Sequence, residues 1–258
     1  FDRIGNVRSC RDYYVYWSFE WDSFYIHFGG PFYIDEVINR PDTEDIDGLS
    51  SSNFWRAKDA KNATDNSYVD TEGILADIDK LGYSLKYRDG YADAQHYQFA
   101  PFNEPNTLEQ YSDAIDAGRI DMSPTYPVTN CYFVYNEETG LYDRFQHLSG
   151  DSDGPHIDMA NGKQLAFKNI LIQNTYYEVR DLKGYLAFQC IDNTRDGWYF
   201  TNGRGIHVNW EKSSDYGATR YYDDAGNEIQ LNTGKTMVCI VEDGDSFLVD
   251  DEKISSVK

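Results

Sequence analysis

The second half of the sequence alternates short apolar runs with turn residues, and this pattern restricts what the chain can fold into. Runs joined by a few polar or glycine residues are typical of β-hairpins. Three such pairs are residues 131–135 with 141–145, residues 221–222 with 228–231, and residues 237–241 with 246–249. The second half is therefore predicted to be mostly antiparallel β, and the pairs share no fixed spacing that would make a repeat.

The first half has a mixed pattern of strands and helices. It predicts a strand at residues 4–8, a helix at 11–21 capped by Ser9, a buried strand at 24–28 and a helix at 31–39 beginning at Pro31. This order is typical of a β–α–β unit, whose two strands are parallel. A further helix is predicted from Asp70 or Thr71 to Leu81, because Gly82 can close it.

A stretch rich in Pro and Asn, residues 100–107, separates the two patterns. We place a domain boundary there. The prediction is an α+β protein with an N-terminal α/β domain at residues 1–105, containing a partly parallel sheet. A C-terminal β-rich domain follows at residues 106–258, beginning with a weaker helical stretch at 108–117.

The charge of the chain excludes some partners. The 258 residues carry a formal net charge of −21, and the 23 Lys and Arg are scattered. Such a chain repels nucleic acid and anionic membrane surfaces, so no nucleic-acid partner is predicted. The 22 tyrosines suit β-rich surfaces and polar ligand grooves.

Cofactor motifs are absent from the sequence. The four cysteines (Cys10, Cys131, Cys190 and Cys239) lack zinc-ligand spacing. They are interpreted as buried thiols, with disulfides of unreadable pairing as the alternative. The acidic segments 43–48 and 149–154 resemble calcium loops but fail the template at its first and last positions. No metal or other cofactor is predicted.

The best candidate site lies where the first predicted strands end. Arg8 and Ser9 follow one strand, and His27, Gly29 and Gly30 follow the next. In parallel sheets these ends gather on one edge, where ligands usually bind. Gly29-Gly30 leads into a predicted helix, whose free N–H groups attract anions. The alternative is a tight turn without a ligand.

His27 is the candidate catalytic residue, as a general base, and a hydrogen-bonded core histidine is the structural alternative that the sequence favours. No triad spacing or GxSxG motif is present, so whether the protein is an enzyme stays open. Further candidate ligand contacts, each with a solvated-loop alternative, are Arg56, Lys61 and Asn66 beside the same edge, and Arg144 and Asp158 in the second half.

Seven short motifs occur in an order that resembles the YerB-like lipoprotein family of Gram-positive bacteria, a family of unknown function. They are IGNVRS (4–9), IHFGG (26–30), ATDNSY (63–68), GLYDRF (140–145), NILIQ (169–173), NGRGIHVNWEK (202–212) and the segment at 226–235. Relatives carry His where this chain has Asp65, which argues against acid–base chemistry in that loop. The resemblance also implies sequence before Phe1, and hence an unpaired sheet edge near residues 3–8.

The resemblance implies an extracellular protein held to the membrane by a lipid anchor that lies outside this chain. Together with the candidate site, it predicts binding of a polar or anionic cell-envelope ligand such as a glycan, a peptide or another small anion. The alternatives are an envelope hydrolase or transferase that uses His27, and a structural module that binds a partner protein. The sequence does not predict an oligomeric state.

Overall fold

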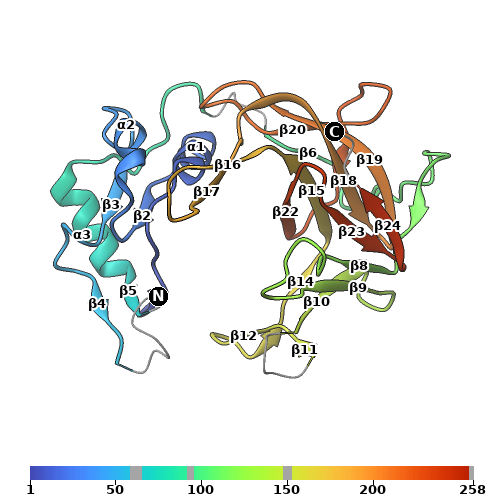
Figure 1. Cartoon of the computed structure of the whole chain (residues 1–258), viewed down its shortest axis with the longest axis horizontal. Coiled ribbons are helices and arrows are strands. Elements are labelled where there is room, and N and C mark those ends of the chain that lie inside the picture. The colour runs from blue at the N-terminus through green and yellow to red at the C-terminus, as the bar shows by residue number, and fades with distance from the viewer. Residues whose placement is uncertain (59–65, 92–95, 148–152, 256–258) are drawn as a thin grey trace. The chain divides into compact units, whose positions relative to one another are not determined.

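The computed structural model describes residues 1–58, 66–91, 96–147 and 153–255, and its secondary structure is mostly β (Figure 1). The chain forms two compact units. The first comprises Phe1–Gln95, Glu178–Ile191 and Ser214–Ala218, and the second comprises His96–Tyr177, Asp192–Ser213 and Thr219–Lys258. A single boundary near residue 105 therefore does not describe the chain, because two later segments return to the first unit.

The described part of the first unit combines short helices and short strands. Its helices are α1 (Asp12–Glu20), α2 (Asp35–Ile38), α3 (Thr71–Leu81) and the 3-10 helix η1 (Phe32–Ile34). Its strands are β1 (Ile4–Gly5), β2 (Tyr25–His27), β3 (Asp45–Asp47), β4 (Trp55–Arg56), β5 (Ser67–Val69) and β17 (Leu186–Phe188), with β16 (Tyr177–Val179) crossing into it.

Helix α3 has the ends that the sequence predicts. The Asp70 carboxylate accepts a hydrogen bond from the Gly73 N–H at 2.7 Å, and Gly82 closes the helix in the left-handed region with φ 74°. The predicted helix at residues 11–21 is also present as α1. Ser9 is not its cap, because Arg11 occupies that position and makes no side-chain capping bond.

The predicted parallel pair of strands is wrong. β1 pairs antiparallel with β5 and forms an edge of the three-stranded sheet β1-β5-β4. The parallel partner of β2 is β3, which lies in the acidic segment 43–48 that resembles a calcium loop. Because η1 and α2 connect β2 to β3, the β–α–β unit exists but begins one strand later.

The second unit contains two larger sheets. The first has the order β20-β19-β18-β15-β22 with β7 beside β19, and the second has the order β11-β10-β9-β8-β23-β24 with β14 beside β10. The strands of the first are β7 (Ile115–Asp116), β15 (Asn169–Thr175), β18 (Asp192–Thr201), β19 (Arg204–Lys212), β20 (Arg220–Tyr222) and β22 (Thr236–Glu242). Those of the second are β8 (Arg119–Asp121), β9 (Tyr132–Asn136), β10 (Leu141–Gln146), β11 (Gly154–Pro155), β14 (Ala166–Phe167), β23 (Ser246–Val249) and β24 (Glu252–Ser255). Two short pairs complete the unit: β12 (Ile157–Asp158) with β13 (Lys163–Gln164), and β6 (Gln98–Phe99) with β21 (Gln230–Leu231).

Strand β15 is buried along its whole length because both faces of its sheet are covered. Ile170 and Ile172 belong to one apolar cluster, with Phe133 of the second sheet. Leu171 belongs to the opposite cluster, with Leu108 and Trp210. Alternating side chains thus enter different cores, which explains why NILIQ lacks an apolar–polar alternation.

The hairpin predictions have mixed outcomes. β9 and β10 form the first hairpin as predicted. The second pair is joined only by an antiparallel bridge between Tyr222 and Glu228. The third hairpin is wrong, because β22 pairs with β15 while β23 pairs with β8 and β24. The predicted helical stretch at 108–117 is also wrong, since β7 lies there.

A buried polar network joins β15 and β18 to residue 232. The Tyr199 hydroxyl donates to Asn169 Oδ1 at 2.9 Å and accepts from the Asn232 N–H at 3.1 Å. Asn169 and Asn232 are 0% and 2% exposed, so water cannot replace these bonds easily.

We expect Tyr199→Phe to lower the free energy of unfolding by about 1–3 kcal/mol, because the change removes two buried hydrogen bonds and leaves the Asn232 N–H and Asn169 Oδ1 only their 3.2 Å bond to each other. Urea denaturation measures this. Tyr176→Phe, at a 57% exposed position, is the matched control and should change stability little. Equal effects of the two variants would contradict the structural role of the network.

Candidate functional site

His27 is enclosed within the first unit. The residue is 3% exposed, with Nδ1 3.0 Å from the Gly29 carbonyl oxygen and Nε2 2.9 Å from Asp45 Oδ2. The parallel register of β2 and β3 places Tyr25 opposite Asp45 and His27 opposite Asp47. Both ring nitrogens are thus satisfied inside the protein, which argues against His27 as a catalytic base and favours its interpretation as a core histidine.

The surroundings of His27 favour its charged form. Burial lowers the pKa of the imidazole, but hydrogen bonds to Asp45 and the Gly29 carbonyl, with the nearby Asp47 carboxylate, outweigh it and raise the pKa above the ordinary value. Asp45 is therefore a partner that stabilises an imidazolium rather than a group that activates a base for an external substrate.

The double glycine forms a tight turn whose backbone N–H already binds a carboxylate of the chain. The Gly29 N–H donates to Asp47 Oδ1 at 2.7 Å, so it is not available to an external anion. Gly29 has φ 65°, and a Cβ on Gly30 would lie 3.1 Å from Cys10 Cβ. η1 and α2 are also too short to provide the predicted helix N-terminus.

Part of the predicted edge does come together. The Phe28 N–H donates to the Arg8 carbonyl at 2.8 Å, beside the exposed Ser9. Arg56 lies 4.5 Å from the Phe28 ring centroid and donates to Asn66 Oδ1 at 2.7 Å. Lys61 and Asp65 lie outside the described residues.

Arg144 and Asp158 belong to the second unit. Arg144 is 9% exposed, and its Nε and Nη1 atoms have no hydrogen-bond partner among the described residues. Asp158 organises a turn by accepting from the Ala160 N–H at 2.9 Å, which is a local structural role. The four cysteines are buried and free, as interpreted from their spacing. Within the described residues, no group of three or more His, Cys, Asp and Glu side chains has metal-binding geometry.

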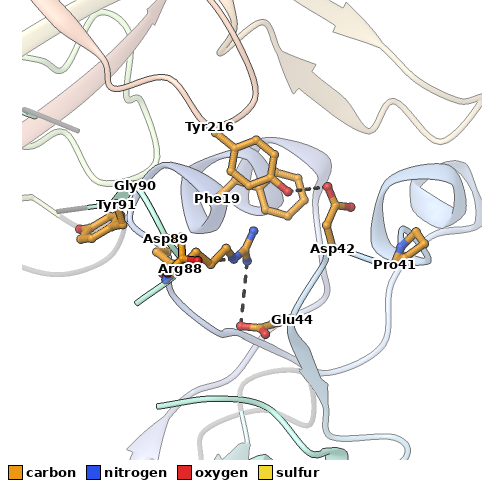
Figure 2. A pocket seen from close by; sticks show the side chains of 10 residues that line it. Phe19, Pro41, Asp42, Glu44, Arg88, Asp89, Gly90, Tyr91 and Tyr216 are labelled. Atoms are coloured by element: carbon orange, nitrogen blue, oxygen red, sulfur yellow. Dashed lines mark hydrogen bonds and ion pairs between the residues drawn. The ribbon is translucent and has the colours of Figure 1, made fainter. Parts of the chain in front are cut away.

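A different part of the first unit forms a substantial pocket of about 550 Å³, which we call the Arg88 pocket (Figure 2). Its walls combine aromatic rings with charged side chains. The lining residues are Phe19, Asp22, Pro41, Asp42, Glu44, Arg88, Asp89, Gly90, Tyr91 and Tyr216. They come from the end of α1, the segment before β3, the segment after α3 and the returning segment Ser214–Ala218.

Ion pairs fix Asp22 and Asp42 among the polar side chains of the pocket. Arg88 Nε lies 2.7 Å from Asp22 Oδ1, while its Nη2 is 4.0 Å from Glu44. Arg40, which does not line the pocket, forms two hydrogen bonds with Asp42 at 3.0 and 2.8 Å. These bonds and one from the Tyr216 hydroxyl hold the pKa of Asp42 well below its usual range.

The aromatic side chains form a stacked wall. The Tyr216 ring lies over Phe19 with centroids 4.8 Å apart, and Figure 2 shows the Arg88 side chain between these rings and Glu44. The Arg40 guanidinium is 4.7 Å from the Phe19 ring centroid, and the Arg88 guanidinium is 5.3 Å from that of Tyr216. Both rings therefore accept cation–π contacts from the chain itself.

Sequence reasoning missed this pocket because its walls come from segments far apart in the chain. The only local signal was the high aromatic content of residues 11–21.

Sequence reasoning also missed His207, whose ring lies between Asp196 and Asp224. Those two carboxylates raise the pKa of His207 to about 9.

None of the described helices is long and apolar enough to cross a membrane.

Comparison with known proteins defines the class. Residues 1–84 match the family model described as "Protein of unknown function (DUF3048) N-terminal domain". Residues 122–238 match the corresponding C-terminal domain. Together the two models cover more than half of the chain, so the protein belongs to the DUF3048 family, confirming the resemblance seen in the motifs.

A curated relative is the "Putative lipoprotein YerB" of Bacillus subtilis (strain 168). It is 28% identical over 249 residues, covering 95% of this chain and 69% of the relative. The crystal structure of YerB protein from Bacillus subtilis matches with a TM-score of 0.73 at 23% identity, covering 93% of this chain and 74% of that one. The structural likeness supports the fold, and the sequence likeness is to a protein that carries lipoprotein in its name.

The raised pKa of His27 predicts a pH-dependent contribution to stability. This contribution is fully present below the ordinary pKa of about 6.5 and is lost as the pH rises through the folded-state value. We expect His27→Gln to lower the free energy of unfolding by about 1–3 kcal/mol near pH 5.5, and by less near pH 8.5. Urea denaturation at both pH values measures the difference, with exposed His147→Gln as the control. A larger loss at high pH would contradict the assignment.

Proposed function

We propose that this protein is an extracellular, membrane-anchored lipoprotein that binds a glycan of the cell envelope in the Arg88 pocket. The observation that carries the proposal is a cavity of about 550 Å³ in which ring faces and fixed polar groups line the same space. Sugars bind to such surfaces because their C–H faces stack on aromatic rings while their hydroxyls bond to carboxylates and guanidinium groups.

The arrangement of the polar groups supports a binding role. Asp22 and Asp42 are held by Arg88 and Arg40, so their carboxylates do not need to reorganise when a ligand arrives. Tyr216 is 41% exposed and offers ring surface, while the Phe19 beneath it is 2% exposed and supports it. The enclosed His27 lends no support to a hydrolase or transferase, so we keep the binding role alone.

The charge balance of the pocket changes the expected ligand. Four carboxylates and one guanidinium line it. A small anion would meet more repulsion than attraction there, so a neutral or cationic glycan fits better than the anionic ligand suggested by Arg8 and the glycines.

We expect Tyr216→Ala and Tyr91→Ala each to weaken binding to Bacillus subtilis cell-wall polysaccharide by about tenfold, because each removes a ring that lines the pocket. Binding is measured by co-sedimentation of the full chain with the insoluble polymer, after circular dichroism has confirmed folding.

Two further variants locate the binding surface in the same assay. Tyr176→Ala removes an exposed ring of the second unit and should leave binding unchanged. Arg8→Ala tests the edge predicted from the sequence and should also leave it unchanged. Loss of binding with Arg8→Ala and retention with both pocket variants would move the site away from the Arg88 pocket.

A further inference from the structure

The aromatic wall of the Arg88 pocket already contacts two cations that belong to the chain. Arg40 and Arg88 approach the stacked pair of Phe19 and Tyr216, with guanidinium-to-centroid distances of 4.7 and 5.8 Å to Phe19. Carboxylates stand beside each guanidinium, Asp42 for the first and Asp22 for the second. Ring faces flanked by carboxylates commonly bind guanidinium or ammonium groups. The two internal guanidinium contacts therefore indicate that this wall favours cations.

The internal pairs leave part of the negative charge of the pocket unmatched. Asp22 and Asp42 each form close ion pairs, at 2.7 and 2.8 Å. Glu44 lies 4.0 Å from Arg88, beyond hydrogen-bond distance, and Asp89 has no ion-pair or hydrogen-bond partner among the described residues. Both side chains line the cavity.

The open space lies beside these two carboxylates and two rings. Tyr91 and Tyr216 line the same cavity, and Tyr87 stacks on Tyr91 with centroids 4.4 Å apart. A ligand ammonium group in this space can pair with Glu44 and Asp89, while its carbon skeleton contacts the rings. An uncharged group of the same size would form no ion pair with these two carboxylates, which are partly exposed to water.

We infer that the glycan carries a free amino group, and that Glu44 and Asp89 bind its ammonium form. This inference rests on the proposed glycan-binding function and adds the chemical class of the ligand, an amino sugar that is not N-acetylated. The Arg88 guanidinium holds Asp22 in place and separates the ammonium from it, so Arg88 is a positioning residue for the wall rather than the cation that fills the site.

The test compares two soluble ligands that share one sugar backbone and differ in N-acetylation, which replaces each ammonium group with a neutral amide. Isothermal titration calorimetry with the full chain measures binding of the glucosamine tetramer and of its fully N-acetylated counterpart. We expect the amine form to bind about tenfold more tightly, with an affinity that falls as salt rises. The double variant Glu44→Gln/Asp89→Asn should lose this preference.

A matched charge change controls for the overall field of the chain. Asp35→Asn/Glu36→Gln removes two exposed carboxylates of α2 in the same unit, outside the pocket, and should keep the preference. Loss of the preference in this variant would show a general charge effect and would overturn the inference.

The remaining outcomes separate the inference from the proposed function. Equal or tighter binding of the acetylated tetramer overturns the amino-sugar inference and leaves glycan binding in place. Failure of both tetramers to bind, together with wild-type binding of Tyr216→Ala to cell-wall polysaccharide, overturns the proposed function itself.

Discussion

The aromatic face of α1 depends on rings that come from much later in the chain. Phe188 stacks on Tyr13 with centroids 4.2 Å apart, and Tyr216 stacks on Phe19 at 4.8 Å. Both later rings belong to segments that return to the first unit. Closing such long loops costs conformational entropy, which ring contacts and the Arg180–Asp12 ion pair offset. Residues 1–95 alone therefore lack part of their core and one wall of the Arg88 pocket, so the site depends on sequence matched by the C-terminal family model.

A second constraint is the burial of His27. A buried imidazole requires hydrogen-bond partners, and the parallel pairing of β2 with β3 supplies Asp45 while Asp47 bonds to the Gly29 N–H. This explains why the acidic segment at 43–48 forms a strand: two of its carboxylates are used inside the unit. The same contacts explain why a stretch that resembles an anion-binding edge is a structural junction. The Gly29 N–H does bind a negative charge, but the Asp47 carboxylate of the chain provides it.

The sequence predicts features whose determinants are local. The cap at Asp70 and the glycine at Gly82 lie at the ends of one helix, and the β9–β10 hairpin is fixed by its own turn. Pairing between distant strands is not local. The turn residues between β22 and β23 therefore predict a hairpin, whereas in the structure β22 pairs with β15 and β23 pairs with β8. The Arg88 pocket cannot be predicted from the sequence for the same reason. Phe19, Arg88 and Tyr216 carry no common motif, and only the folded unit brings them together.

The charge of the pocket has two components that act at different ranges. The net charge of −21 attracts cations generally, but physiological salt screens this effect beyond about 8 Å. Discrimination therefore depends on groups in contact with the ligand. Arg88 pairs with Asp22, and Arg40 is shared between Asp42 and Asp215, which lowers the repulsion among the acids that support the ring wall. Glu44 and Asp89 face the remaining space with less compensation. Internal arginines thus divide the acidic pocket into a structural part and a part whose charge an incoming cation can match.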